Sequence, residues 1–439
     1  MELCNTYSPL FKVHGWDATV KARGYLAGLL MNCPRKNMER MEEFVEDFRY
    51  QDQQHFLSDS PWDHRAVFKQ VARDVDKILG GAGSVLVIDE SGFEKKGKMS
   101  VGVARQWNGR LGKVDNAQVG VFTALSNGET ASLVATRLYL PDDWTEDPAR
   151  CEKAKIPEDR REYKTKIELA WEMIEESLTN KLRFKWVAFD ALYGNSAWLL
   201  RKVEQAGLTF VGDVHCDQHL YLENPKPYLP ESKGGKGRKP KKLRSDSKSI
   251  KIETAFSQLS ADQWDTIKVR EGTKGDIKVE ATRLRVWFWD GQESQAKCWW
   301  AVCLRSGGET KYFVSNANET VSLETLIRKH AARFWIERCF QDAKTTLGMA
   351  DYQARGWIAW HHHMALVAIA MFFVLQERKL NLKSLDLITF TDIVEILDHY
   401  LPRTDRTEAG LLRNIELRHR KRRIDIERNK IKSRQYERN

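Results

Sequence analysis

The chain has 439 residues, 42% of them hydrophobic and 30% charged, which is enough for two or three folded domains with a large core. Its formal net charge of +10 favours a polyanionic partner. The seven cysteines form no CxxC pair and the N-terminus does not resemble a signal peptide, so we expect reduced thiols and a cytoplasmic protein. The most apolar run, 364–375, is too short to cross a bilayer, so we expect a buried helix and no membrane partner.

The first part of the chain, residues 1–82, is predicted to be helical. Amphipathic segments cover 18–31 and 35–48, and Ser60-Pro61 provides an N-cap and a first-turn proline for a third helix that ends at Leu79. A helical DNA-binding region is one interpretation, and a packing appendage is the other.

Residues 83–215 have the pattern of an α/β domain. A short apolar strand, 84–89, ends in Asp89 and is followed by an expected turn, and a second one, 185–190, ends in Asp190. The other expected elements are strands at 99–107, 118–126, 131–140 and 208–214, and helices at 160–180 and 196–206. The coarse order is that of an RNase H-like fold, β-β-β-α-β-α-β, and it predicts a mixed sheet in which the first strand of that fold lies centrally beside the fourth.

Residues 216–320 differ from the preceding segment in sequence pattern and are predicted to form an antiparallel β-rich insertion. Its expected strands are 249–256, 265–272, 276–290, 296–305 and 310–317. A basic run at 233–244 is predicted to be a DNA-contacting loop, with solubilising charge as the alternative. Its candidate contacts are Lys236, Arg238, Lys239, Lys241, Lys242 and Arg244.

The remaining chain is predicted to be helical. One long helix is expected over 323–348, within a core segment 321–352, and further helices over 354–378 and 385–400 lie in a C-terminal region, 353–439. From residue 403 onward there are 13 Lys/Arg against 6 Asp/Glu, which suits an arm for nonspecific phosphate contact or simply a solvated terminus.

The helix at 323–348 carries a stripe of four functional side chains. His330, Arg333, Glu337 and Lys344 are separated by three, four and seven positions, which places them on one face of a helix. A carboxylate between two permanent cations suits a metal-dependent phosphodiester enzyme, because the acid holds a metal and the cations hold phosphate. The alternative is a solvated face with i, i+4 ion pairs.

Three carboxylates are therefore candidates for one site. Asp89 and Asp190 end apolar strands that are neighbours in an RNase H-like fold, and a late helix carries Glu337 across the sheet. Their oxygens would bind two hard divalent cations, Mg²⁺ with Mn²⁺ as a substitute. Alone, a strand-ending aspartate is more often a cap or turn former, but two in matching contexts favour the metal site.

At these residues the chain resembles the DDE transposases of bacterial insertion sequences, in the branch with a β-rich insertion before the glutamate. That branch has a Tyr-x2-Arg-x3-Glu-x6-Lys signature, matched here by Arg333, Glu337 and Lys344, while His330 replaces the tyrosine. The segments QHFLSDSPWD, VLVIDESGFEKKG and WVAFDALYGN further resemble the 701 family of insertion sequences.

The resemblance implies a cut-and-paste transposase acting on double-stranded DNA, as a homodimer, in the bacterial cytoplasm or at the nucleoid. Asp89, Asp190 and Glu337 would be its metal-binding catalytic triad, and Arg333, Lys344 and, less clearly, His330 would contact DNA. A DNA-binding regulator without cleavage and an RNase H-like nuclease that only hydrolyses remain the alternatives.

Several weaker candidates remain. Lys95 and Lys96 follow the first aspartate and are possible DNA contacts, while Asp213 is a rival carboxylate that is better explained as a structural cap. The cluster His215, Cys216 and His219 lacks a fourth zinc ligand, and 361–363, three consecutive histidines, suit a helix end or solvent. In the insertion, base stacking or core packing is expected of Trp287, Trp289, Trp299 and Trp300.

Overall fold

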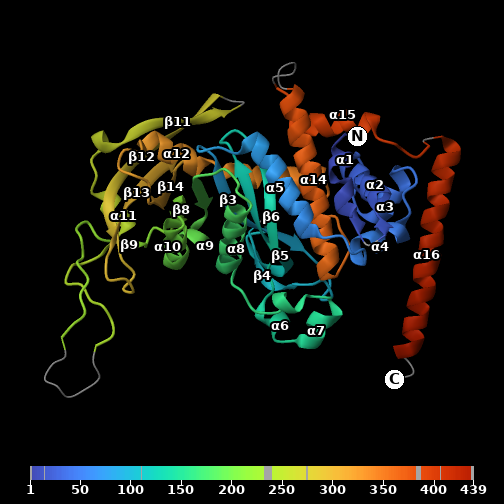
Figure 1. Ribbon diagram of the computed structural model, residues 1–439, viewed down its shortest axis with the longest axis horizontal. Helices are drawn as coiled ribbons and strands as arrows, with labels where there is room; N and C mark the ends of the chain where they lie inside the picture. The colour runs from blue at the N-terminus through green and yellow to red at the C-terminus, as the bar shows by residue number, and fades with distance from the viewer. Residues whose placement is uncertain are drawn as a thin grey trace.

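A computed structural model describes residues 2–436, apart from 14, 110, 232–239, 273–274, 382–386 and 406. Its centre is one mixed sheet of ten strands, in the order β11-β12-β13-β14-β8-β7-β3-β5-β4, with β6 also paired to β5 (Figure 1). The strands of this sheet are β3 (Val85–Glu94), β4 (Ala104–Asn108), β5 (Lys113–Ser126), β6 (Ala131–Leu138), β7 (Trp186–Phe189), β8 (Thr209–Val214), β11 (Asp265–Gly272), β12 (Gly275–Phe288), β13 (Lys297–Ser306) and β14 (Glu309–Ser315). Two short pairs lie outside it: β1 (Lys12–Val13) with β2 (Trp16–Asp17), and β9 (His219–Leu220) with β10 (Ile250–Lys251).

The central strands have the order of an RNase H-like core. Reading across β6, β5, β3, β7 and β8, the first strand of the core, β3, lies between the second and the fourth. It runs antiparallel to β5 and parallel to β7, and β7 is parallel to β8. The predicted fold class and the placement of the first strand beside the fourth are confirmed.

Helices cover both faces of this core. They are α1 (Glu2–Tyr7), α2 (Thr19–Leu30), α3 (Met38–Phe44), α4 (Tyr50–Ser58), α5 (His64–Leu79), α6 (Asp142–Thr145), α7 (Pro148–Lys153), α8 (Lys166–Thr179), α9 (Ala191–Gly194), α10 (Ala197–Gln205), α11 (Ile252–Ser257), α12 (Leu323–Ala331), α13 (Phe334–Thr346), α14 (Trp357–Asn381), α15 (Phe390–Tyr400) and α16 (Glu408–Tyr436). Because side chains alternate along a strand, Glu90 of β3 faces α8, where it pairs with Lys166. Its neighbour Asp89 shares the opposite face with Phe122, whose ring contacts those of Phe340 in α13 and Trp360 in α14.

The β-rich insertion continues the core sheet. Strands β11 to β14 form an antiparallel meander, and β14 pairs with the outer edge of β8 through Phe313 and Asp213 (Figure 1). The strand expected over 249–256 is wrong, because only Ile250–Lys251 are extended and Ile252–Ser257 form α11, which buries Ile252 and Phe256. The division of the chain into separate domains stays a prediction.

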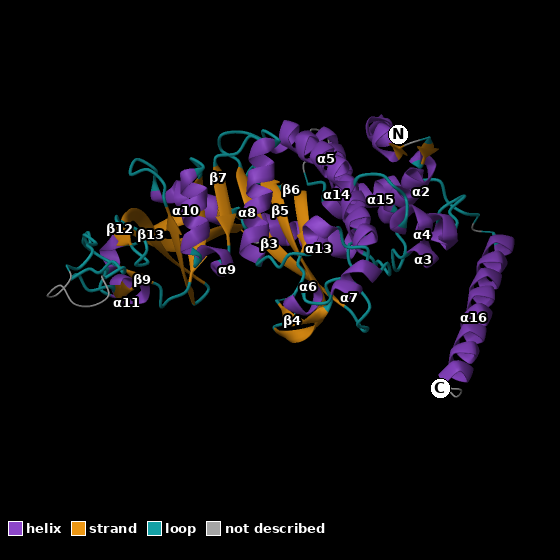
Figure 2. Ribbon diagram, turned by 60° about the horizontal axis from the view of Figure 1, so that its bottom comes forward, coloured by secondary structure: helices purple, strands orange, loops and turns teal. Residues whose placement is uncertain are grey.

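The terminal regions are helical, as predicted. Asp63, rather than Ser60, caps the third predicted helix, because its carboxylate accepts the Arg65 backbone N–H. Helix α14 is long and apolar enough to cross a membrane, but 89% of its most apolar window is buried inside the protein. The predicted buried helix at 364–375 is therefore confirmed. Helix α16 projects away from the body (Figures 1 and 2).

The three consecutive histidines of α14 are also core residues, so their expected helix-end or solvent position is wrong. His361, His362 and His363 are at most 3% exposed. His362 lies between the carbonyl oxygens of Leu57 and Trp62, each 2.9 Å from one ring nitrogen. The three rings therefore join α14 to the helices around it.

Candidate active site

Three aspartates lie in one row across three parallel strands. Ile88 of β3 is in register with Phe189 of β7, and Phe189 is in register with Gly212 of β8. Each next residue is an aspartate: Asp89, Asp190 and Asp213, which we call the acidic row. Neighbouring strands are about 4.8 Å apart, so the first two carboxyl groups of the row are close enough to share a ligand.

The predicted turn directly after Asp89 is wrong. Strand β3 continues to Glu94, and each of its residues from Val85 onward is paired with the long strand β5. The neighbour on the other side is shorter, since β7 ends at Phe189. Asp89 therefore lies beside the end of the parallel strand β7, although its own strand, β3, continues.

Asp190 is held by the short helix that follows it. Its Oδ1 accepts the backbone N–H of Leu192 at 2.9 Å, which makes it the N-cap of α9. The helix packs directly on β8 at Gly194, where an added Cβ would lie 1.9 Å from the Asp213 carbonyl oxygen. A glycine at this position is thus required for α9 to hold Asp190 beside Asp89.

The pair carries negative charge that the surrounding protein neutralises incompletely. Burial, followed by repulsion from Asp190, raises the pKa of Asp89 to about 7, while Arg333 opposes the shift. Burial, followed by the charge of Glu90, raises the pKa of Asp190, again opposed by Arg333. Glu90 itself is paired, with Lys166 Nζ at 3.0 Å and Tyr193 Oη at 2.9 Å. The two aspartates therefore fit a divalent cation, which would relieve their repulsion.

Asparagine at position 89 is expected to stabilise the metal-free protein at pH 8. A carboxyl whose pKa is raised on folding stabilises the fold below its unfolded pKa, and that stabilisation is lost as the pH rises through about 7. Asp89→Asn removes this loss, worth roughly 2–4 kcal/mol at about 1.4 kcal/mol per pH unit. The free energy of unfolding, measured with urea in EDTA, should exceed wild type at pH 8 and converge with it near pH 4. A constant difference at all pH values would contradict the prediction.

The predicted helix over 323–348 is broken at Ala332 and Arg333, so a single continuous helix is wrong. The backbone N–H groups of these two residues bond three residues back, to Lys329 and His330, which tightens the chain into a turn between α12 and α13. Both helices still lie over the strands that carry the acidic row.

Glu337 lies on α13 between two cations, Arg333 and Lys344, which both interact with residues of β3. On one side of it, Arg333 acts on Asp89 and Asp190, and on the other, Lys344 Nζ donates to the Gly92 carbonyl oxygen at 2.9 Å. The Glu337 side chain is exposed. Among the described residues, no three His, Cys, Asp or Glu side chains form a group that could hold a metal ion. Completing a three-carboxylate site therefore requires the Glu337 side chain to move toward the aspartates.

Arg333 and His330 meet at the third member of the acidic row. The Arg333 guanidinium and the His330 ring both bond the Asp213 carboxylate, the latter through Nε2 at 2.5 Å. Although burial acts in the opposite direction, these two partners lower the pKa of Asp213. Asp213 is thus a partner for two residues of the signature helices, which its position at the end of an apolar strand did not reveal.

The other predicted DNA contacts lie in different settings. Lys95 turns inward, with Nζ 3.6 Å from the Tyr352 ring centre, and burial lowers its pKa to about 8, whereas Lys96 is exposed. In the basic run, Lys241, Lys242 and Arg244 are exposed. Lys236, Arg238 and Lys239 lie outside the described residues. DNA contact by any of them stays a prediction.

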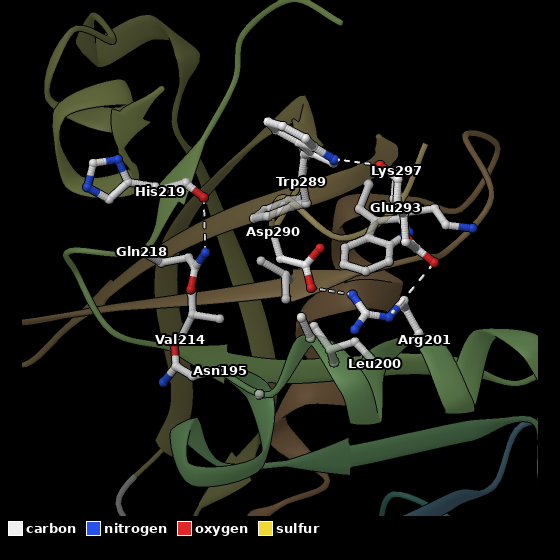
Figure 3. Close-up of a pocket in the computed structure, with 15 residues that line it drawn as sticks. Asn195, Leu200, Arg201, Val214, Gln218, His219, Trp289, Asp290, Glu293 and Lys297 are labelled. Atoms are coloured by element: carbon white, nitrogen blue, oxygen red, sulfur yellow. Dashed lines mark hydrogen bonds and ion pairs between the residues drawn. The ribbon is translucent and has the colours of Figure 1, made fainter. Parts of the chain in front are cut away.

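Two of the four tryptophans line a cavity of about 180 Å³ between α10 and the insertion (Figure 3). They are Trp289, whose Nε1 donates to the Glu293 carbonyl oxygen at 2.7 Å, and Trp299, which is buried and bonds Glu204. Of the other two, Trp287 pairs through its backbone with Tyr221, and Trp300 lies under the guanidinium of Arg283. Core packing explains Trp299, and base stacking by the other three stays a prediction.

The chain is similar to known proteins over most of its length. Residues 10–276 match a family model described as DDE superfamily endonuclease. The chain belongs to this family. The matched segment includes the whole acidic row and ends before α12, so the role of Glu337 stays a prediction from the helix signature. The chain is also 24% identical, over 80% of its own length and 80% of the relative's, to a probable transposase for insertion sequence element IS701 from Microchaete diplosiphon. The predicted resemblance to insertion-sequence DDE transposases is confirmed.

Proposed function

We propose that this DDE endonuclease is a transposase that cuts the ends of its own insertion sequence and joins the freed 3′-hydroxyl groups to target DNA. The observation that carries the proposal is the adjacent pair Asp89 and Asp190, two carboxylates held together against their mutual repulsion. Asp190 also caps α9, but two buried carboxylates side by side suit phosphodiester chemistry assisted by divalent metal ions.

The residues of the site divide into metal ligands and phosphate contacts. Asp89, Asp190 and, after a side-chain movement, Glu337 would hold two Mg²⁺ ions, for which Mn²⁺ would substitute. Bound there, the ions would lower the pKa of the attacking water or hydroxyl and stabilise the leaving oxygen. Arg333 and Lys344 lie on either side of Glu337, where cations balance the charge of a bound phosphate.

Double-stranded DNA, both element ends and target, is the proposed partner, bound by a homodimer that holds two ends together in the bacterial cytoplasm. The exposed basic residues support this partner, above all Arg420, Arg422 and Arg423 in α16. The first half of that helix is tied to the body by Asn414, which donates to the Glu43 carbonyl oxygen, by Arg418 to Glu43 and by Lys421 to Glu42. The exposed cations Arg422, Arg423 and Arg428 follow these contacts and are available to a polyanion.

The decisive experiment incubates purified protein with DNA carrying the element ends, identified in the DNA that flanks the gene, together with a supercoiled target. We expect Mg²⁺-dependent cleavage at the ends and joined products in the target. Cleavage without joining would support a nuclease that only hydrolyses. Binding without cleavage would support a DNA-binding regulator.

Neutralising the outer part of α16 should weaken DNA binding. Glutamine at Arg420, Arg422 and Arg423 removes three exposed cations, so the slope of log affinity against log salt should fall by up to about 3. Fluorescence anisotropy from 50 to 300 mM NaCl measures this slope. A control with the same charge change at exposed Lys153, Lys181 and Lys185 should retain most of it. Equal losses in both variants would show that α16 has no special part in binding.

A further inference from the structure

The Asp213 carboxylate holds the two signature helices on both sides of their break. Its Oδ1 lies 2.5 Å from Nε2 of His330, at the end of α12, and its Oδ2 accepts from Nη1 of Arg333, at the start of α13. Since each oxygen has its own donor, the carboxylate joins the end of α12 to the start of α13 and holds the guanidinium at the end of β8.

The surroundings of this contact are rigid. Asp213 lies within β8 and pairs through its backbone with Phe313 of β14, and the Phe313 ring stacks on the His330 imidazole at 4.4 Å between ring centres. The side chains of Asp213, His330 and Arg333 are 17%, 12% and 17% exposed. Water therefore competes weakly with these bonds, and the guanidinium has little freedom to turn away.

The contact between Arg333 and Asp213 lies on the same acidic row as Asp89 and Asp190. Arg333 bonds Asp213 at one end of this row, and the other two aspartates follow residues that are in register on the next two strands. The positive charge of Arg333 is thus held in the row of three aspartates. Asp213 accepts its hydrogen bond, and Asp89 and Asp190 are the proposed metal ligands. A purely structural ion pair needs no such alignment with two acids on neighbouring strands.

We propose that Asp213 is a positioning residue that, together with His330, holds the Arg333 guanidinium against the Asp89–Asp190 pair. This inference rests on the proposed function, because it assigns Arg333 a place beside the reacting phosphate. It also explains the histidine that replaces tyrosine in the signature, since the His330 ring donates to the same carboxylate and packs on Phe313.

A double-mutant cycle tests the proposal. Asp213→Asn keeps the shape of the side chain but presents an amide to the guanidinium, and it should slow end cleavage on the order of 10- to 100-fold, as expected for loss of an orienting partner. Arg333→Gln should slow it at least as much. If Asp213 acts through Arg333, the double variant should be no slower than Arg333→Gln, within about threefold. Losses that multiply would overturn the proposal.

A second arm needs no DNA. The same three variants, with Asp217→Asn as an exposed control four residues away, should show coupling between positions 213 and 333 in urea unfolding and none between 217 and 333. If wild type fails to cut end DNA, the proposed function fails, and this arm alone decides whether the two residues are linked. If wild type cuts but positions 213 and 333 are uncoupled in both arms, the positioning role is excluded.

Discussion

Alanine at Asp89 or at Asp190 should reduce metal-dependent DNA cleavage by roughly 10³-fold or more, because each change removes a proposed metal ligand. DNA binding should persist, since the exposed cations are unchanged. In a gel assay with Mg²⁺, both variants should shift end-bearing DNA as wild type does and leave it uncut. In EDTA at pH 8 the folded state of Asp89→Ala should be at least as stable as wild type, because the buried repulsion between the two carboxylates is gone, whereas Asp190→Ala also loses the N-cap bond of α9.

The control for this experiment is Asp217→Ala, which removes an exposed carboxylate just beyond the same edge of the sheet. It should cut at the wild-type rate. If Asp89→Ala retained wild-type cleavage, the acidic pair would have no catalytic part, and the assignment of the active site would be wrong. Loss of cleavage together with loss of the folded state would point instead to a structural role, and the unfolding measurement distinguishes the two.

Glutamine at Glu337 should have the second largest effect, a loss of cleavage of roughly 10²–10³-fold. The substitution keeps the size and polarity of the side chain but removes the charge that a third metal ligand needs. Mn²⁺ should restore part of the activity if the glutamine oxygen still reaches the metal, because Mn²⁺ binds neutral ligands more readily than Mg²⁺ does. Initial rates across a titration of each metal measure both effects.

Two matched controls make this result specific to Glu337. Glu324→Gln removes an exposed carboxylate from α12 that is paired with Arg328, and it should leave cleavage unchanged. Glu90→Gln tests the rival acid next to Asp89, which is paired with Lys166 and Tyr193 on the other face of the sheet. A larger loss at position 90 than at position 337 would reassign the third carboxylate to β3.

The arrangement of the core could be predicted from the sequence because it depends on local patterns. The apolar runs before Asp89 and Asp190 specify buried parallel strands, and the order of the elements places those strands side by side. The adjacency of the two acids follows from that order alone. The spacing of Glu337 and Lys344 still places both on one side of α13, but the break at Ala332 and Arg333 separates them from His330, so the predicted single stripe is interrupted.

What remained hidden depends on partners far away in the chain. Asp213 lies 117 positions before His330 and 120 before Arg333, and no spacing within a helix or a strand reports such a contact. The length of β3 was underestimated because its continuation past Asp89 is stabilised by β5, and a stretch with two acids and a glycine has a weak strand propensity of its own. The break at Arg333 lies in a sequence with no proline or glycine, so tertiary contacts determine it.

Because β14 pairs with β8, the outer edge of β8 can be covered only after the insertion has been synthesised. Strand β8 ends at Val214, but the strand that covers its outer edge ends at Ser315, and the helices that neutralise Asp213 follow later still. A growing chain that has reached the insertion therefore exposes an unpaired edge beside three uncompensated carboxylates, which is a hazard for mispairing. Fragments that stop within the insertion should aggregate, and contacts of such long range should make folding of the full chain slow.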